Sequence, residues 1–247
     1  MSLPPVVRGV RLVQGDAGQG ARAASPTFVE RAYDYLLSMI LSVQIAPGER
    51  IAIDKVARKL DISQTPVREA LSQLEAERLV LRTPNVGYRA SPPMNRSEMH
   101  EVYTLRMLIE PYVAEQAARH MDEASLAVLR GIEEEMGTLE AGDERSYARF
   151  AEADARLHRQ IADGCGNRLI AETIERLHAH LQIFRSLYRT NAPEEAAVEH
   201  RQLIAALSRR DPEAAGAAMR EHLIASERRM DLATATLSDA GEDVVEA

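Results

Sequence analysis

Four side chains in the second half of the chain have the types and spacing of a metal site. Asp154 and His158 lie four residues apart, so on a helix they project the same way, one turn from each other. His200 and His222 lie on two later predicted helices, so one carboxylate and three imidazoles would come from three helices of one bundle. This donor set suits a borderline divalent ion, Zn²⁺, Ni²⁺, Mn²⁺ or Fe²⁺, with one or two positions left for water or a ligand oxygen.

Spacing alone leaves other interpretations of these four residues open. A chain with 7 His and 38 acidic residues offers an Asp/His pair at this spacing by chance, and a histidine that faces a core is more often hydrogen-bonded than metal-bound. An open His/Asp site can also activate water, so a metal-dependent enzyme is one alternative. Against catalysis, no residue stands out as a paired general base. A closed metal site with a structural role is a further alternative.

A second informative region covers the first 93 residues, where the charge balance differs from the rest of the chain. The net charge is −8, but residues 1–93 hold 12 Lys and Arg against 9 Asp and Glu, whereas residues 94–247 hold 18 against 29. The first part therefore carries +3 and the second −11. DNA responds to a local basic patch rather than to total charge, so the overall acidity does not exclude a nucleic-acid partner.

The elements expected in this basic part form a winged helix-turn-helix. Two short helices are joined by the tight turn Asp61-Ile62, and a Gly-containing hairpin follows directly. In chain order, the pattern predicts a helix from Thr27 to the turn at Pro47-Gly48, a very short strand at Ile51 and Ile53, a helix capped by Asp54 that ends at Leu60, a helix capped by Ser63 or Thr65 that ends near Arg78, and hairpin strands over 79–83 and 88–91.

The start of the second short helix is expected to enter the major groove of DNA. Gln64 and Thr65 can hydrogen-bond base edges or phosphate, and Arg68, one turn later, can reach guanine or phosphate. Other expected contacts are the phosphate neutralisers Lys55, Arg58 and Lys59 on the preceding helix, and Arg82, Gly87 and Arg89 on the wing. For the three residues of the preceding helix, an ordinary solvated face is the alternative.

Three segments of the basic part form a recognisable motif set: Ile45-Ala46-Pro47-Gly48-Glu49-Arg50-Ile51, then Asp61-Ile62-Ser63-Gln64-Thr65-Pro66-Val67-Arg68-Glu69-Ala70-Leu71, and then Leu79-Val80. With these motifs, the chain from Thr27 to Ser91 resembles the GntR family of bacterial transcription regulators. Three departures from the family pattern stand out: Gln64 occupies a position where Arg is frequent, Asp54 one that is a DNA-contacting Arg in some members, and Arg78 one that is commonly Gly. Fewer guanidinium groups predict fewer guanine contacts, and Gln64 can favour adenine.

After Pro92-Pro93 the sequence predicts an almost entirely helical second part. Apolar periodicity and capping residues predict six helices, which short connections arrange as an antiparallel bundle. The fold class is therefore mainly α, a winged helix-turn-helix domain followed by an all-α bundle. The expected helices span residues 97–120, 123–140, 144–163, 168–189, 193–209 and 212–235, with Ser97, Asp122, Asp143, Asn167 and Asp211 as caps.

The helical part carries a second set of motifs: Leu105-Arg106-Met107-Leu108-Ile109-Glu110, Asp154 with His158, Gly166-Asn167-Arg168-Leu169, Glu199-His200 and Arg220-Glu221-His222. With these motifs, the bundle resembles the FCD domain of the FadR-type branch of GntR regulators, roughly from Ser97 to Met230. In the metal-binding members the matching motifs carry one Asp and three His ligands, so the resemblance implies a metal held by Asp154, His158, His200 and His222, with Zn²⁺ slightly favoured. Members that bind lipid-CoA esters lack the full ligand set and resemble this chain less.

An open metal beside Arg106 would trap a carboxylate, since the ion takes one oxygen and the guanidinium holds a second. The resemblance and this chemistry imply a small organic acid as effector. The alternative for Arg106 is an intrahelical pair with Glu110, four residues later. Further residues that can line the cavity on helical geometry, with core or surface roles as alternatives, are Tyr103, His178, Gln182 and Arg185.

The chain is expected to divide into a flexible arm (1–25), a DNA-binding domain (26–93), an effector-binding and dimerisation domain (94–236) and an acidic tail (237–247). No stretch approaches the roughly 20 apolar residues of a membrane helix, and residues 1–25 lack the apolar core of a signal peptide. The single cysteine, Cys165, cannot form an internal disulfide. We therefore expect a cytoplasmic protein without a membrane partner, with Cys165 in a structural role.

Together these features predict a ligand-responsive DNA-binding regulator rather than an enzyme. The resemblance implies a homodimer whose two heads bind double-stranded operator DNA of two-fold symmetry. We expect a repressor that a small organic carboxylate releases from its operator. The alternatives are a metal-dependent enzyme and an architectural DNA-binding protein with a structural metal.

Overall fold

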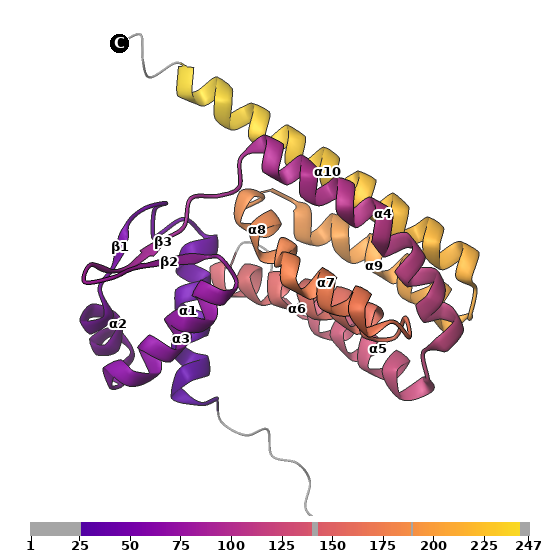
Figure 1. The fold of residues 1–247 in the computed structure, drawn as a ribbon, viewed down its shortest axis with the longest axis horizontal. Helices are drawn as coiled ribbons and strands as arrows, with labels where there is room; N and C mark the ends of the chain where they lie inside the picture. The colour runs from indigo at the N-terminus through magenta and orange to yellow at the C-terminus, as the bar shows by residue number, and fades with distance from the viewer. Residues whose placement is uncertain (1–25, 140–142, 189, 243–247) are drawn as a thin grey trace, which may run out of the picture.

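A computed structural model describes residues 26–139, 143–188 and 190–242, and shows a small N-terminal head beside a helical bundle (Figure 1). The expected arm over residues 1–25 lies outside the described residues. The head contains α1 (Phe28–Leu41), β1 (Arg50–Ile51), α2 (Ile53–Leu60), α3 (Gln64–Ala76), β2 (Val80–Thr83) and β3 (Gly87–Ala90).

The head has the predicted winged helix-turn-helix topology. The α1 helix begins with a capping box in which Thr27 accepts from the Glu30 amide and Glu30 accepts from the Thr27 amide. Between α2 and α3 the chain turns at Asp61, which has a left-handed conformation with φ of 54°. The strands form one antiparallel sheet in the order β1-β3-β2, with β2 and β3 paired as the wing.

One predicted cap in the head is wrong. The α2 helix begins at Ile53, one residue before Asp54, and its N-cap is Ala52, which makes no side-chain cap bond. Asp54 instead lies in the first turn, where its Oδ2 accepts from Arg58 Nη2 at 2.9 Å. A carboxylate in the first turn still favours the helix, because it lies near the positive end of the helix dipole.

The described part of the body contains seven helices, one more than predicted. The two longest, α4 and α10, lie side by side along one edge of the bundle (Figure 1). The predicted caps Asp122, Asp143 and Asn167 accept backbone hydrogen bonds at their helix starts. The helices are α4 (Arg96–His120), α5 (Glu123–Gly137), α6 (Glu144–Asp163), α7 (Arg168–Leu177), α8 (Ala179–Ser186), α9 (Ala192–Ser208) and α10 (Pro212–Glu242).

The extra helix arises because the predicted helix over 168–189 is two helices that meet at His178. His178 has φ of 46° and ψ of 33°, a left-handed conformation that a continuous α-helix cannot contain. Two other boundaries also differ from the prediction. Asn95, not Ser97, caps α4 with a capping box, and α10 continues to Glu242, into the segment expected to be the acidic tail.

Head and body pack directly on each other. The α1 helix contacts α3 inside the head and also α6 and α8 of the body. Its inner face buries Leu36, Leu37 and Ile40 completely. Cys165 is a buried free thiol after α6, as its predicted structural role requires. Among the described residues, no helix is both long and apolar enough to cross a membrane.

Candidate metal centre and DNA-binding surface

The four predicted metal ligands meet inside the bundle. Asp154 and His158 come from α6, His200 from α9 and His222 from α10. Each offers a ligand atom within 4.8 Å of the other three, and all four side chains are buried. The spacing of the α6 pair explains its part of this arrangement, because residues four apart lie one above the other on a helix.

Three neighbouring groups orient these ligands through hydrogen bonds. His158 Nδ1 lies 2.8 Å from Glu110 Oε2 of α4, and His222 Nδ1 lies 2.7 Å from Glu199 Oε2 of α9. Asp154 Oδ2 lies 2.6 Å from His180 Nδ1 of α8. A carboxylate on one imidazole nitrogen fixes the ring and directs the other nitrogen toward a metal.

Electrostatics keep the carboxylates charged and the two oriented histidines neutral. Burial alone raises the pKa of Asp154, but the imidazoles of His180 and His200 hold it well below its usual range. Burial, together with electrostatic repulsion from the neighbouring His180 ring, lowers the pKa of His158 to about 4 against the opposing effect of Glu110. Burial also lowers the pKa of His222 to about 4 against its bond to Glu199. Neutral imidazole and ionised carboxylate are the forms that bind a metal.

Unbonded nitrogens inside the cluster test whether the residues fit a metal. His158 Nε2 and both ring nitrogens of His200 are buried without a hydrogen-bond partner among the described residues. His200 Nε2 lies 3.2 Å from Asp154 Oδ1 but makes no hydrogen bond to it. Leaving buried polar atoms unpaired costs about 1–3 kcal/mol each, and a cation bound through one nitrogen of each ring would remove most of that cost. The donor set therefore fits a divalent metal.

A small enclosed cavity of about 10 Å³ lies against this cluster. Arg106 lines it, with Nε 2.5 Å from Glu110 Oε1, so the intrahelical pair that was the alternative for Arg106 is present. Tyr103 does not line this cavity as predicted; its ring lies beside Arg106, and its hydroxyl is 2.7 Å from Oγ of Ser226, which does line it. The full lining is Arg106, Asp154, His180, Ile183, Phe184, Leu187, Ala192, Ala196, His222, Ser226 and Arg229.

The other three predicted ligand-binding residues are not brought to this cavity. His178 lies at the α7/α8 junction and lines a different, open pocket. Gln182 Nε2 donates to the main-chain oxygen of Arg78 at 3.0 Å, toward the head. Arg185 is 4% exposed, and neither terminal nitrogen has a hydrogen-bond partner among the described residues. The break at His178 rotates α8 relative to the continuous helix from which these positions were predicted.

Sequence reasoning missed the residues that support the ligands. Glu110 was considered only as a partner of Arg106, although its second oxygen holds His158. Glu199 directly precedes His200, and that adjacency was the available signal for a carboxylate near the site. His180 had no sequence signal, since its contact with Asp154 depends on how α8 packs.

The predicted DNA-contacting side chains are all exposed, and Gly87, which has no side chain, is half-buried. Gln64, Thr65 and Arg68 are exposed at the N-terminal end of α3, with Arg68 Nη2 3.4 Å from Gln64 Oε1. On the wing, Arg82 and Arg89 are exposed and Gly87 has φ of 107°, which favours glycine.

The basic face of α2 is also exposed. Lys55, Arg58 and Lys59 all face solvent, but Arg58 is paired with Asp54. Arg89 donates to the main-chain oxygen of Gly48 at 2.9 Å, which ties the wing to the turn before β1. The exposure of Lys55, Arg58 and Lys59 agrees both with the predicted phosphate contacts and with the alternative of an ordinary solvated face.

Two family models match the chain, one for each part. The family described as bacterial regulatory proteins, gntR family, matches residues 28–89, and the FCD domain matches residues 101–225. The HTH-type transcriptional repressor GlaR of Escherichia coli (strain K12) is 30% identical over 202 residues, covering 78% of this chain and 90% of its own length. The repressor RspR of the same organism is 27% identical over 197 residues, covering 78% and 85%.

Solved structures show the same fold. E. coli McbR/YncC matches with a TM-score of 0.61 at 20% identity, covering 86% of this chain and 100% of that one. A transcriptional regulator from Rhodococcus sp. RHA1 matches with a TM-score of 0.58 at 22% identity, covering 82% and 96%.

Proposed function

Because the chain belongs to the gntR family of bacterial regulatory proteins, carries an FCD domain and is a ligand-responsive DNA-binding regulator rather than an enzyme, we propose that its effector is a small organic carboxylate bound at a metal. The observation that carries the proposal is the buried set of one carboxylate and three imidazoles, in which His158 and His200 have unbonded nitrogens. Asp154, His158, His200 and His222 would hold the ion, with Zn²⁺ slightly favoured over Ni²⁺, Mn²⁺ and Fe²⁺.

The charge around the cluster favours an anionic ligand. Arg106 and Arg229 are positive, and Glu110, Glu199 and Asp154 are negative, which leaves one net negative charge when the imidazoles are neutral. Glu195 also pairs with Arg229, but it is exposed and its charge is screened by solvent, so it is not counted with the site. A divalent cation turns this into one net positive charge and supplies a Lewis-acid position for a ligand oxygen. A carboxylate then neutralises the buried site, and buried charge is tolerated only when it is paired.

The chain's own residues can complete the recognition of such an acid. Arg106 bonds to Glu110 through Nε and Nη2, so its Nη1 is the atom proposed for the second carboxylate oxygen. The hydroxyls of Tyr103 and Ser226 are hydrogen-bonded to each other, with either able to donate, and can hydrogen-bond a further polar group of the ligand.

The head would bind the operator DNA. Gln64, Thr65 and Arg68 would contact bases, with Lys55, Arg58, Lys59, Arg82, Gly87 and Arg89 on the DNA backbone or minor groove. We propose a homodimer that binds a two-fold symmetric operator in the cytoplasm and represses until the acid binds. The repressor role follows the names of the similar proteins GlaR and RspR.

Calorimetric titration of metal-loaded protein with lactate, L-malate, succinate and gluconate tests the ligand site. We expect at least one acid to bind, and to lose binding when the metal is stripped or in His222→Ala. The closed cavity of about 10 Å³ is the observation that favours the second candidate, a structural metal. Retained metal with no binding by any of a broad panel of acids would favour that candidate.

A further inference from the structure

The α8 helix lies between the metal cluster and the head, and presents a different face to each. His180, Ile183, Phe184 and the following Leu187 line the closed cavity, at the i, i+3, i+4, i+7 spacing of one helix face. The same helix contacts α1 of the head. It is only eight residues long and is separated from α7 by the left-handed residue His178, so it is not a rigid extension of α7.

The cavity that α8 closes is too small for any organic acid. Its volume of about 10 Å³ is at the limit for a single water molecule. The opposite walls come from α4, α6, α9 and α10, which pack together as the core of the bundle. Making room for a carboxylate therefore requires a wall of the cavity to move, and α8 is the shortest of the helices that form it.

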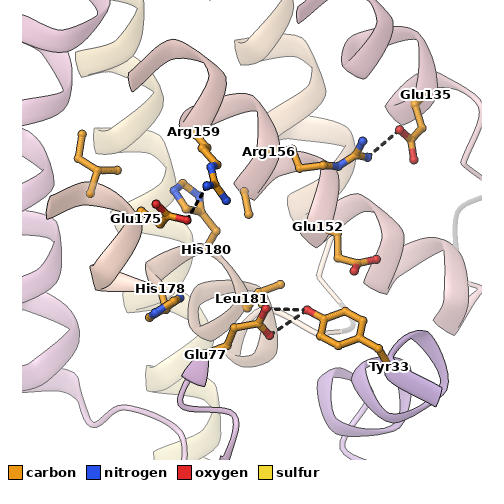
Figure 2. A pocket seen from close by; sticks show the side chains of 12 residues that line it. Tyr33, Glu77, Glu135, Glu152, Arg156, Arg159, Glu175, His178, His180 and Leu181 are labelled. Carbon is orange, nitrogen blue, oxygen red and sulfur yellow. Dashed lines mark hydrogen bonds and ion pairs between the residues drawn. The ribbon is translucent and has the colours of Figure 1, made fainter. Parts of the chain in front are cut away.

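On the side that faces the head, α8 is hydrogen-bonded to the main chain directly after α3, the proposed recognition helix. Gln182 Nε2 donates to the main-chain oxygen of Arg78 at 3.0 Å and lies 3.5 Å from that of Glu77, directly after α3. Figure 2 shows the adjacent pocket, where Glu77 and Tyr33 of the head are hydrogen-bonded to each other and face Leu181 and His180 of α8. The α8 helix therefore contacts the metal cluster through the hydrogen bond of His180 with Asp154. Two residues later, Gln182 contacts the chain segment directly after α3.

We propose that Gln182 is a positioning residue that transmits ligand binding from the metal site to the recognition helix: an acid that enters the cavity displaces α8, and Gln182 then pulls on or releases the main chain at Arg78. The inference rests on the proposed function, since it needs a ligand in that cavity. It assigns Gln182 to signalling rather than to the ligand contact expected from sequence.

Hydrogen–deuterium exchange of the metal-loaded full chain tests this coupling with L-malate as the probe. In wild type we expect L-malate to change exchange in both the 179–187 and the 74–80 peptides. In Gln182→Leu the 179–187 response should remain and the 74–80 response should be lost, with L-malate affinity unchanged within about twofold. Ser186→Ala, on the same helix, is the matched control and should respond as wild type does.

A second variant keeps the coupling testable when L-malate does not bind. Ala196→Leu adds volume to the wall of the closed cavity and should displace α8 without any ligand. In Ala196→Leu, exchange should then change in both peptides. When Gln182→Leu is added to Ala196→Leu, exchange should change in the 179–187 peptide alone. A response confined to 179–187 in wild type or in Ala196→Leu would overturn the proposal, as would a 74–80 response that survives Gln182→Leu. Failure of every acid to bind would contradict the proposed function alone.

Discussion

At the scale of single residues, the two glutamates that hold the imidazoles explain how a histidine cluster is prepared for a metal. Glu110 and Glu199 each accept from Nδ1 of one ring, so His158 and His222 are oriented before any ion arrives. Glu199 keeps its charge because hydrogen bonds from Arg229 and His222 outweigh burial and lower its pKa to about 2. These supporting groups are therefore expected to affect metal affinity without touching the metal.

Glu199→Gln tests this support. The amide is a weaker acceptor than the carboxylate and makes His222 a poorer ligand, so we expect metal affinity to fall by about 10–100-fold. Competition with a chromogenic chelator measures the change. Glu195→Gln is the matched control, because Glu195 also pairs with Arg229 but is more exposed and has no histidine partner in the described structure. Equal affinities for Glu199→Gln and wild type would show that Glu199 does not support the site.

Glu77 at the head–body pocket predicts a pH dependence of stability. Burial raises the pKa of Glu77 above its usual 4.5, and the hydrogen bond from Tyr33 only partly opposes this shift. The folded state therefore prefers the neutral carboxyl, and the contribution of Glu77 to the free energy of unfolding decreases as pH rises above about 4.5.

The Glu77→Gln variant lacks this titration and keeps an acceptor for Tyr33. Its free energy of unfolding should match wild type at pH 4 and exceed it at pH 7, measured by urea unfolding. Glu69→Gln, at an exposed position of α3, controls for the loss of one negative charge. A Glu77→Gln variant less stable than wild type at pH 7 would contradict the sign.

Which residues could be predicted depended on how local the signal was. The α6 pair follows from helical spacing, and the two distant histidines from motif resemblance, so all four metal-site residues are found together. Glu110 and His180 depend on contacts between helices, which no spacing in the sequence encodes.

At the scale of elements, α3 presents its apolar side to the head and its polar N-terminal end to solvent. Val67, Ala70, Leu71 and Leu74 are buried, so the helix is held firmly while Gln64, Thr65 and Arg68 stay exposed. The periodicity that buries one face thereby determines which residues can face DNA.

Arg68→Ala tests that face on a selected operator. If Arg68 reads a base edge, we expect a loss of about 1–3 kcal/mol in binding and relaxed preference at one base pair. Lys59→Ala is the comparison, and should weaken all sequences evenly and reduce the salt dependence. Competition binding with a randomised DNA pool measures both. A uniform loss for Arg68→Ala would assign Arg68 to phosphate instead.

The α7/α8 boundary shows where element prediction fails. Apolar positions continue at helical spacing through residues 168–189, but His178 is left-handed, and histidine gives no signal of a break comparable to Gly or Pro. The prediction missed a single helix boundary. Because of that boundary, His178, Gln182 and Arg185 do not line the cavity as predicted.

At the scale of the whole molecule, the chain combines a basic head with an acidic body. The fold class and family were predicted from the sequence and are confirmed, because helical periodicity, caps and motifs are local signals. The packing of α1 on α6 and α8 was not predictable, since it depends on surfaces from both parts of the chain. That packing places α8 between the candidate metal cluster and the chain segment directly after α3.

The most direct test of the account is the operator affinity of metal-loaded protein with and without an acid shown to bind at the metal. Fluorescence anisotropy with a labelled operator gives the affinity. We predict a decrease of about 5–150-fold on saturation with the acid, and no such response in His222→Ala. An acid that occupies the metal site and leaves the operator affinity of the wild-type protein unchanged would contradict the account.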